Sequence, residues 1–320
     1  MESLQNAKPK QIHLLYYEKI TWERDFIIND LLEGMNVIVR YFNNQSMLSL
    51  IEDKNIISNS ILVINGWIDF NDVLKLASYS KPKVIFYMSD EFGTQSHMIM
   101  LEKYTNVIFF QYNHIYQYDI TRDYQISLGY CSGYLNKFKQ KNLANSNLAN
   151  SVKLIESGII KPIVDREYNC SFIGTKKSDR EHMINIFSQM PKTHFAFTQN
   201  NWVLDKQEYS PEKCFEIYNN SIYVIQGRGN SSLDCFRIYE AVVAGAIPVI
   251  VGSEQEIQNT FYYKNNIPPF IYSDNWENAF IICNNLLSNL SGLQKVQSDI
   301  LNWWKAHIEF INKIIKKEFV

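Results

Sequence analysis

The sequence has little of what marks a metal-binding, disulfide-bonded or membrane-spanning protein. Its 320 residues include only five cysteines, which form neither a Cys-x-x-Cys pair nor a Cys/His pair with the spacing of metal ligands. No apolar run reaches the ~20 residues that a membrane span requires, and the first residues are polar. We therefore expect reduced thiols, no signal peptide, no membrane span and a cytoplasmic location. A location in the Golgi lumen would require an anchor that had been removed.

An excess of charge of either sign is also missing. The chain carries 31 basic and 33 acidic residues, which leave a net charge of −2. Without a global positive field, neither nucleic acid nor an anionic membrane is the expected partner, although a local basic site is compatible with this balance. Hydrophobic residues make up 46% of the chain, enough to bury a sizeable core, and at this length we expect two α/β domains.

Short β-rich runs alternate with helical patterns throughout the first half of the chain. This alternation is typical of βαβ units around a parallel sheet. We expect residues 1–161 to form a Rossmann-like lobe of about five strands. The predicted strands are 11–17, 36–42, 60–66, 83–89 and 107–112.

A second alternation follows Pro162 and predicts a second parallel sheet in residues 162–292. Its strands are expected at 170–175, 193–198, 221–227, 246–252 and 269–273. The helical pattern of residues 293–320, which includes Trp303 and Trp304, would pack back across both lobes. Two such lobes enclose a cleft at the carboxyl ends of their strands, where open α/β folds bind their ligands.

Residues 221–253 are the most informative segment of the second lobe. They read as a strand, a glycine-flanked basic loop, a helix and a further strand. Asp234 has the residue type and the position of a helix N-cap, and Gly245 supplies a left-handed stop before the next strand. The loop therefore leads to the positive end of a helix dipole, which is a favourable place for an anion.

The side chains of this segment suggest a nucleotide diphosphate as that anion. Gly227 and Gly229 flank Arg228 and would let the backbone approach a ligand closely. Arg237 and Glu240 are three residues apart and share one face of the helix. Arginine forks onto phosphate oxygens, and glutamate accepts hydrogen bonds from ribose hydroxyls. The alternative is that Arg237 and Glu240 merely pair with each other on a solvated face.

The same segment resembles the carboxyl-terminal motif of the exostosin-type glycosyltransferases. In that family a strand is followed by Pro-Arg-Gly, a Ser/Asp-rich loop, Arg-x-x-Glu-Ala and Gly-Cys-Ile-Pro-Val-Ile. The matching residues are Gly227-Arg228-Gly229, Asp234-Cys235-Phe236-Arg237, Glu240-Ala241 and Gly245-Ala246-Ile247-Pro248-Val249-Ile250. Two upstream segments are similar as well, namely Phe172-Ile173-Gly174 followed by Arg180, and Ser89-Asp90-Glu91, which is similar to the amino-terminal lobe of bacterial and ribitol-xylosyl relatives. Gly227 stands for the family's proline and Ala246 for its cysteine.

The resemblance implies a GT-B fold, with an acceptor-side first lobe and a second lobe that binds a nucleotide-sugar, expected to be a UDP-sugar. It implies inversion at the anomeric carbon, no cofactor and no required metal, and transfer to a hydroxyl of a glycan or glycoconjugate. The sequence independently supports the expectation that no metal is required, because it contains no Asp-x-Asp motif for a metal-bound diphosphate. The residue eight positions before Glu240 is Ser232, so the glutamate pair of retaining enzymes is absent too.

Eight residues are expected to bind the donor. Three of them, Arg180, Arg228 and Arg237, would neutralise the leaving diphosphate in place of a metal ion. The full set is Gly174, Arg180, Gly227, Arg228, Gly229, Asp234, Arg237 and Glu240.

An inverting displacement needs a base that takes the proton of the acceptor hydroxyl. Asp90 and Glu91 follow the strand predicted at 83–89 and would project from the first lobe into the cleft. Asp90 is the first candidate for the catalytic base and Glu91 the second. The alternative is that both carboxylates only cap the next helix, since acids are common at strand-to-helix turns.

Two other functions are compatible with the sequence. A fucosyltransferase-like GT-B enzyme would use a GDP-sugar, but the Gly-Arg-Gly loop and Arg237 favour the exostosin-type interpretation. A non-catalytic module would bind a nucleotide-sugar or a glycan without turnover.

Overall fold

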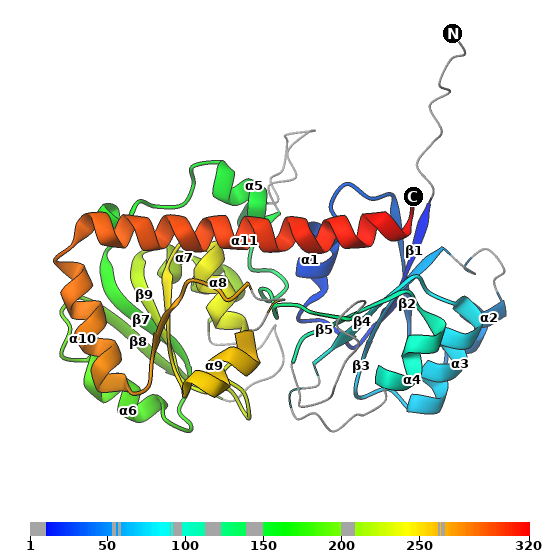
Figure 1. The fold of residues 1–320 in the computed structure, drawn as a ribbon, viewed down its shortest axis with the longest axis horizontal. Coiled ribbons are helices and arrows are strands. Elements are labelled where there is room, and N and C mark those ends of the chain that lie inside the picture. Colours follow the sequence, from blue (N-terminus) through cyan, green and yellow to red (C-terminus); the bar gives the residue numbers. More distant parts are fainter. Residues whose placement is uncertain are drawn as a thin grey trace, which may run out of the picture.

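Two parallel β-sheets form the core of the protein in the computed structural model. The structure describes residues 11–52, 56, 59–89, 91, 98–112, 123–138, 150–199, 209–261, 263 and 266–320. The sheets lie beside each other, and a long C-terminal helix runs along both (Figure 1). The predicted fold class, two Rossmann-like lobes with a C-terminal helix, is therefore confirmed.

The first sheet has six parallel strands in the order β2-β1-β3-β4-β5-β6. Its strands are β1 (Ile12–Tyr17), β2 (Val37–Phe42), β3 (Ser60–Asn65), β4 (Val84–Met88), β5 (Val107–Phe110) and β6 (Asp123–Gln125). The first five were predicted, whereas β6 has only three residues, too few to form a recognisable strand pattern. The inner strands β1, β3, β4 and β5 are buried along their whole length, which explains their continuous apolar runs.

The second sheet has five parallel strands in the order β11-β10-β9-β7-β8, and each of them lies at a predicted strand. They are β7 (Tyr168–Thr175), β8 (Thr193–Thr198), β9 (Ser221–Gln226), β10 (Ile247–Val251) and β11 (Ile271–Ser273). Because all strands run in parallel, the loops that follow them meet at one edge of each sheet.

Helices alternate with the strands along the chain, as in βαβ units. In the first lobe they are α1 (Arg24–Phe26), η1 (Ile27–Leu31), α2 (Met47–Glu52), α3 (Phe70–Ser80), α4 (Met98–Leu101), η2 (Glu102–Tyr104) and η3 (Asn136–Phe138). The remaining ones are α5 (Ser151–Glu156), η4 (Ile163–Asp165), α6 (Arg180–Phe187), α7 (Pro211–Asn219), α8 (Phe236–Val243), α9 (Glu254–Phe261), α10 (Trp276–Leu287) and α11 (Leu290–Glu318).

Side-chain caps fix where several helices begin. At α7, the side chain of Ser210 accepts a hydrogen bond from the Lys213 N–H, and Pro211 occupies the first helical turn, where its missing N–H costs nothing. At α11, the side chain of Asn289 accepts a hydrogen bond from the Gly292 N–H at 3.0 Å. These caps show how local sequence sets the start of these two helices.

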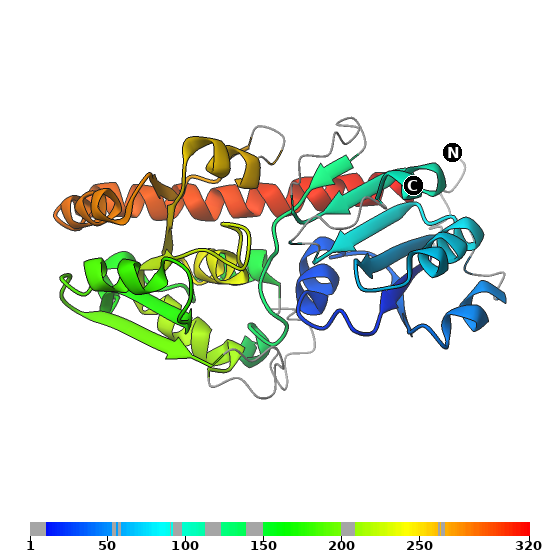
Figure 2. The same cartoon turned by 90° about the horizontal axis from the view of Figure 1, so that it is seen from below.

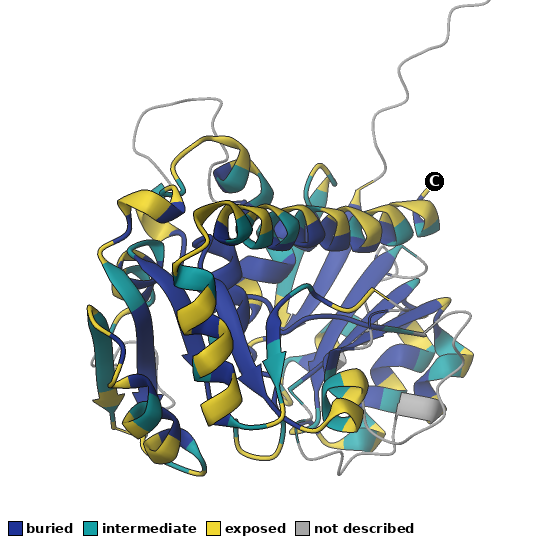
Figure 3. Ribbon diagram, turned by 60° about the vertical axis from the view of Figure 1, so that its left-hand side comes forward, coloured by how far each residue is buried: buried dark blue, intermediate teal, exposed yellow. Residues whose placement is uncertain are grey.

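Helix α11 links the two lobes and extends along both, as Figures 1 and 2 show from two directions. On the second lobe, Nε2 of Gln297 donates to the carbonyl of Gly245 at 2.7 Å. On the first lobe, Nδ2 of Asn312 donates to the carbonyl of Leu31 at 2.9 Å. The face of α11 that lies on the lobes is buried and the opposite face is exposed (Figure 3). The helix therefore braces one lobe against the other.

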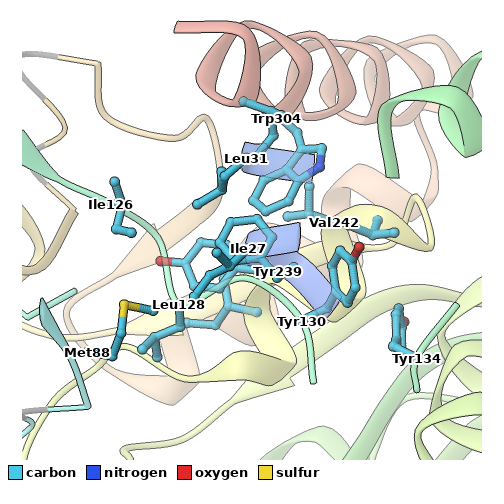
Figure 4. Close-up of a cluster of buried hydrophobic side chains, with 14 of the residues drawn as sticks. Ile27, Leu31, Met88, Ile126, Leu128, Tyr130, Tyr134, Tyr239, Val242 and Trp304 are labelled. Carbon is cyan, nitrogen blue, oxygen red and sulfur yellow. The ribbon is translucent and has the colours of Figure 1, made fainter. Parts of the chain in front are cut away.

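A cluster of buried side chains fills the space between the lobes beneath α11 (Figure 4). Trp304 of α11 belongs to this cluster and is fully buried, with its ring centre 5.9 Å from that of Phe26 in the first lobe and 5.8 Å from that of Tyr239 in α8. The indole Nε1 donates to Oγ of Ser151 at 2.8 Å. Burying an aromatic side chain of this size contributes about 2–3 kcal/mol, so this cluster holds the lobes together.

None of the five cysteines forms a disulfide, in agreement with the reduced thiols predicted from their spacing. Four of them are buried, and Cys235, just before α8, is half-buried. Among the helices that the structure describes, none is both long enough and apolar enough to cross a membrane.

Candidate functional site

Helix α8 begins at the carboxyl edge of the second sheet, directly after the loop that follows β9. Cys235 is its N-cap residue and makes no capping hydrogen bond with its side chain. The prediction that Asp234 caps the helix is therefore wrong. Instead, Asp234 is 3% exposed and its Oδ1 accepts a hydrogen bond from the Cys235 N–H at 2.9 Å. Burial raises the pKa of its carboxyl to about 7.

Gly227 and Gly229 lie where neighbouring atoms would crowd a Cβ. A Cβ on Gly227 would lie 2.6 Å from Cγ of Arg180, and a Cβ on Gly229 would lie 3.0 Å from Oε1 of Glu91. The first contact is within the second lobe, and the second is between the lobes. Both glycines thus let the loop pack against protein side chains, a reason that the sequence did not suggest.

Arg228 is held by two acidic side chains. Its guanidinium forms a two-pronged ion pair with Glu256 of α9, with Nη1 2.8 Å from Oε1 and Nη2 3.0 Å from Oε2. This pairing lowers the pKa of the Glu256 carboxyl to about 2. The backbone N–H of Arg228 donates to Oδ1 of Asp179 at 3.0 Å, and Oδ2 of Asp179 accepts from Nε1 of Trp276 at 3.0 Å. The charge of Arg228 is therefore already balanced within the protein.

Lys177, Arg180 and Arg237 form a basic cluster beside the start of α8. Arg180 is 3% exposed, and its Nη1 donates to the carbonyl of Thr175 at 3.0 Å. Burial lowers the pKa of Arg180, and the positive charge of Arg237 lowers it further. Burial and the charge of Arg180 also lower the pKa of Lys177. The Nε atoms of Arg180 and Arg237 are buried without a hydrogen-bond partner among the described residues, so the basic cluster has charge and donors to offer an anion.

Gly174, the first of the predicted donor residues, lies next to this cluster. A Cβ there would come 2.9 Å from the ring of Phe172 and 3.4 Å from Nη1 of Arg180. The guanidinium of Arg180 lies 5.6 Å from the centre of the Phe172 ring, a cation–π distance. Gly174 therefore leaves the space in which Arg180 lies over Phe172.

Arg237 and Glu240 share one face of α8, but this face is not solvated. Glu240 is 4% exposed, and its Oε1 accepts a hydrogen bond from the Cys131 N–H at 3.2 Å. The hydroxyl of Tyr134 donates to the carbonyl oxygen of Glu240 at 2.6 Å. Burial raises the pKa of the Glu240 carboxyl, and the nearby charge of Arg237 opposes this effect. The alternative of an exposed Arg237–Glu240 pair is therefore wrong.

Glu91 reaches from the first lobe to the loop of the second lobe. Its Oε1 accepts from the backbone N–H groups of Asn230 at 2.8 Å and Ser231 at 2.9 Å, and its Oε2 accepts from Nδ2 of Asn230 at 2.9 Å. Lys177 of the basic cluster donates from Nζ to Oδ1 of the same Asn230 at 2.6 Å. The alternative that Glu91 only caps the next helix is thus wrong. Asp90, the first candidate for the base, lies outside the described residues.

A cavity of about 300 Å³ lies where the lobes meet, as predicted for the cleft. Its walls are mostly polar, with Glu91 and Gln125 from the first lobe and Arg228, Asp234 and Glu256 from the second. Oε1 of Gln125 and Oδ2 of Asp234 are buried and form no hydrogen bond with described residues. These oxygens would accept hydrogen bonds from a ligand that carries hydroxyl groups.

Three charged residues of this site were missed in the sequence, as was the uncharged Gln125. Glu256 lies in the first turn of α9, where acids are common for reasons of the helix dipole alone. Lys177 and Asp179 lie between β7 and α6. In the sequence, only this position directly after a strand indicated that they could belong to the site. Loops at the carboxyl ends of adjacent parallel strands meet, and this rule would have drawn attention to both of them.

The sequence also predicts a site without metal or cofactor. Within the described ranges, no group of three or more His, Cys, Asp or Glu side chains is arranged to hold a metal ion. This finding concerns the side-chain arrangement alone, so independence of metal and cofactor stays a prediction.

Comparison with known protein families identifies the family of this chain. The RXYLT1 C-terminal domain family matches residues 151–320, more than half of the chain. The chain belongs to this family. The matched part contains the whole second sheet, the basic cluster and α11. A curated relative, ribitol-5-phosphate xylosyltransferase 1 of Danio rerio, is 27% identical over 132 residues, which are 37% of this chain and 30% of the relative. The alignment thus spans less than a third of that relative's length.

Solved structures share the fold at low sequence identity. HepE of Anabaena in complex with UDP superposes with a TM-score of 0.52 and 8% identity, over 96% of this chain and 99% of its own. The same protein with UDP and glucose gives a TM-score of 0.50 at 8% identity, over 96% of this chain and 98% of its own. At such identity the likeness concerns the fold alone, which is the GT-B fold of glycosyltransferases. The predicted GT-B fold is confirmed.

Proposed function

We propose that the chain is an inverting glycosyltransferase of exostosin type. It moves a sugar from a UDP-sugar to a hydroxyl of a glycan or glycoconjugate, and it needs no metal ion or cofactor. The observation that carries this proposal is the basic cluster of Lys177, Arg180 and Arg237 at the start of α8. Family membership and the fold support the same reaction class.

The basic cluster suits a leaving diphosphate. Arg180 and Arg237 are buried at their Nε atoms, which have no partner among the described residues, and a phosphate oxygen would satisfy them. The positive end of α8 adds to this field. Because the negative charge on the diphosphate grows as the sugar leaves, groups held in advance around it lower the barrier. Arg228 would join them only after it had left Glu256.

The proposed reaction is a single displacement. The acceptor oxygen forms a bond to the anomeric carbon while the bond between that carbon and the UDP oxygen breaks. A first-lobe carboxylate takes the acceptor's proton, and Asp90 is the first candidate for it and Glu91 the second. In the structure Glu91 is already bonded to the second-lobe loop, which favours Asp90.

The polar cavity between the lobes is the proposed place of the reacting sugars. The side-chain oxygens of Gln125 and Asp234 in its wall can accept hydrogen bonds from the hydroxyl groups of a sugar. The name of the Danio rerio relative makes xylose the first sugar to test and a ribitol phosphate the first acceptor.

We also propose a reducing compartment, the cytoplasm. All five cysteines are free thiols. Asn230 begins an Asn-Ser-Ser sequence, and its side chain bonds to Glu91 and Lys177, so a glycan attached there would break both contacts.

Nucleotide release from sugar donors tests the proposal. The chain is incubated with UDP-xylose, UDP-glucose or GDP-fucose, with and without a ribitol phosphate or glycan acceptor. We expect release of UDP that rises when an acceptor is present. A preference for the GDP-sugar would indicate the fucosyltransferase-like function instead. UDP binding without turnover of any donor would indicate a binding module, and either result would overturn the proposal.

A further inference from the structure

Ser89, at the end of β4, has a backbone conformation that few non-glycine residues adopt. Its φ is +59°, in the left-handed region, which is unfavourable for a residue with a Cβ. Two side chains hold it there. Its Oγ–H donates to Oε1 of Glu23 at 2.6 Å, and its backbone N–H donates to Oε1 of Gln111 at 2.7 Å.

Both of these side chains are buried, each with 1% of its surface exposed. Glu23 directly precedes α1, and Gln111 follows β5, so the residue at the end of β4 is bonded by the loops that follow β1 and β5. No described cation forms an ion pair with Glu23, and burial raises the pKa of its carboxyl. A buried carboxyl with only neutral partners is costly and adds little stability. Its position therefore calls for a role other than holding the fold.

The turn at Ser89 sets the direction of the chain just before both candidate bases. Asp90 and Glu91 follow immediately, and Glu91 reaches Asn230 and Ser231 of the second lobe. If Ser89 returned to an ordinary extended conformation, the chain after it would change direction and Glu91 would lose its contacts with the second lobe. A displacement of about 1 Å at a reacting group can cost a factor of about 100 in rate.

We propose that Glu23 is a positioning residue, which acts through the Ser89 hydroxyl to aim the Asp90–Glu91 segment at the acceptor hydroxyl. This inference rests on the proposed function, because it concerns the base of that reaction. Glu23 itself touches neither sugar and transfers no proton. Donor binding belongs to the second lobe, so this residue acts on turnover and leaves UDP affinity unchanged.

The test compares four variants in transfer assays with saturating donor and acceptor. Glu23→Met keeps the length of the side chain and removes its acceptor oxygens, whereas Glu23→Gln keeps one. Ser89→Ala removes the hydroxyl, and Asp30→Asn changes a buried carboxyl of the adjoining η1 that bonds to the Ser151 N–H instead. We expect kcat to fall about tenfold or more in Glu23→Met and Ser89→Ala, with the Kd of UDP within about twofold of the parent. Glu23→Gln should recover most of the rate, and Asp30→Asn should keep it.

The double variant Glu23→Met with Ser89→Ala supplies the second measurement. Because both changes remove the same hydrogen bond, the double variant should be no slower than the slower single one. Parental kcat in Ser89→Ala, or fully additive losses in the double variant, would overturn the inference. If Glu23→Met does not fold, the kcat and the Kd of UDP of Ser89→Ala and Glu23→Gln test the inference by the same criteria. A parent chain that turns over no donor would refute the proposed function, whereas parental turnover in the variants would refute only this inference.

Discussion

Arg228 and Glu256 bind each other through two parallel contacts of 2.8 and 3.0 Å, while Arg180 and Arg237 have unused Nε donors. The predicted phosphate-binding arginines are therefore not equivalent. Arg228 forms an ion pair with a carboxylate, whereas no described carboxylate lies within ion-pair distance of the basic groups of Lys177, Arg180 or Arg237. Because of this difference, we expect substitution of Arg228 to weaken donor binding less than substitution of Arg237.

Arg237→Ala should weaken UDP binding by about 2–3 kcal/mol, because it removes a charge-assisted bidentate contact, and Arg237→Lys should recover only part of this loss. Arg228→Ala should cost less than about 1 kcal/mol in UDP binding. Calorimetric titration of the three variants with UDP measures both effects. Glu256→Gln serves as the control, since it frees Arg228 from its partner. Equal losses in Arg228→Ala and Arg237→Ala would show that Arg228 leaves Glu256 when the donor binds.

Glu240→Gln should keep the fold but lose recognition of the ribose. The amide oxygen can still accept from the Cys131 N–H, whereas its hydrogen-bonding power toward a hydroxyl is weaker than that of a carboxylate. We expect the parent to bind UDP more tightly than its 2′- and 3′-deoxy analogues, and the variant to bind all of them about equally. Unchanged discrimination in Glu240→Gln would remove Glu240 from the ribose site.

The local pattern of the sequence predicted the strands well, because buried parallel strands are continuous apolar runs between turn residues. Gly245 has a φ of +72°, as the predicted left-handed stop requires. The pairing of Arg228 with Glu256 could not be predicted, because it depends on how the loop after β9 packs against α9. For the same reason Glu91 was predicted as a base or cap and not as a contact between lobes. Asp234 was assigned as a cap from its residue type and its place before the helical pattern, and the N-cap residue is the next one, Cys235.

The stability of the protein should fall with rising pH through the ionisation of Asp234. Burial raises the pKa of this carboxyl from 3.8 to about 7, so between these values the folded state keeps a proton that the unfolded chain has lost. Folding binds protons in this window, and the free energy of unfolding therefore decreases as the pH rises from about 4 to about 7.

Asp234→Asn removes this ionisation and keeps an oxygen for the Cys235 N–H. The difference in unfolding free energy between variant and parent should shift in favour of the variant across the same window and level off above it. Urea unfolding at a series of pH values measures this difference. A difference that stayed constant with pH would mean that Asp234 titrates normally.

Asp90→Asn should lower kcat at saturating donor by about 100-fold or more while the Kd of UDP stays near that of the parent, since loss of a general base affects the chemical step. Glu91→Gln is the matched comparison. It keeps one acceptor oxygen for the Asn230 and Ser231 N–H groups, so we expect a smaller loss of rate. An active Asp90→Asn with an inactive Glu91→Gln would exchange the two roles.

The most direct test of the whole account is calorimetric titration of the chain with UDP in excess EDTA. The account places the diphosphate on Lys177, Arg180 and Arg237 at the start of α8, where arginines and a helix terminus replace a cation. It predicts a Kd of about micromolar order that is the same with EDTA and with added Mg²⁺ or Mn²⁺. Binding that disappears in EDTA and returns with a divalent ion would contradict it.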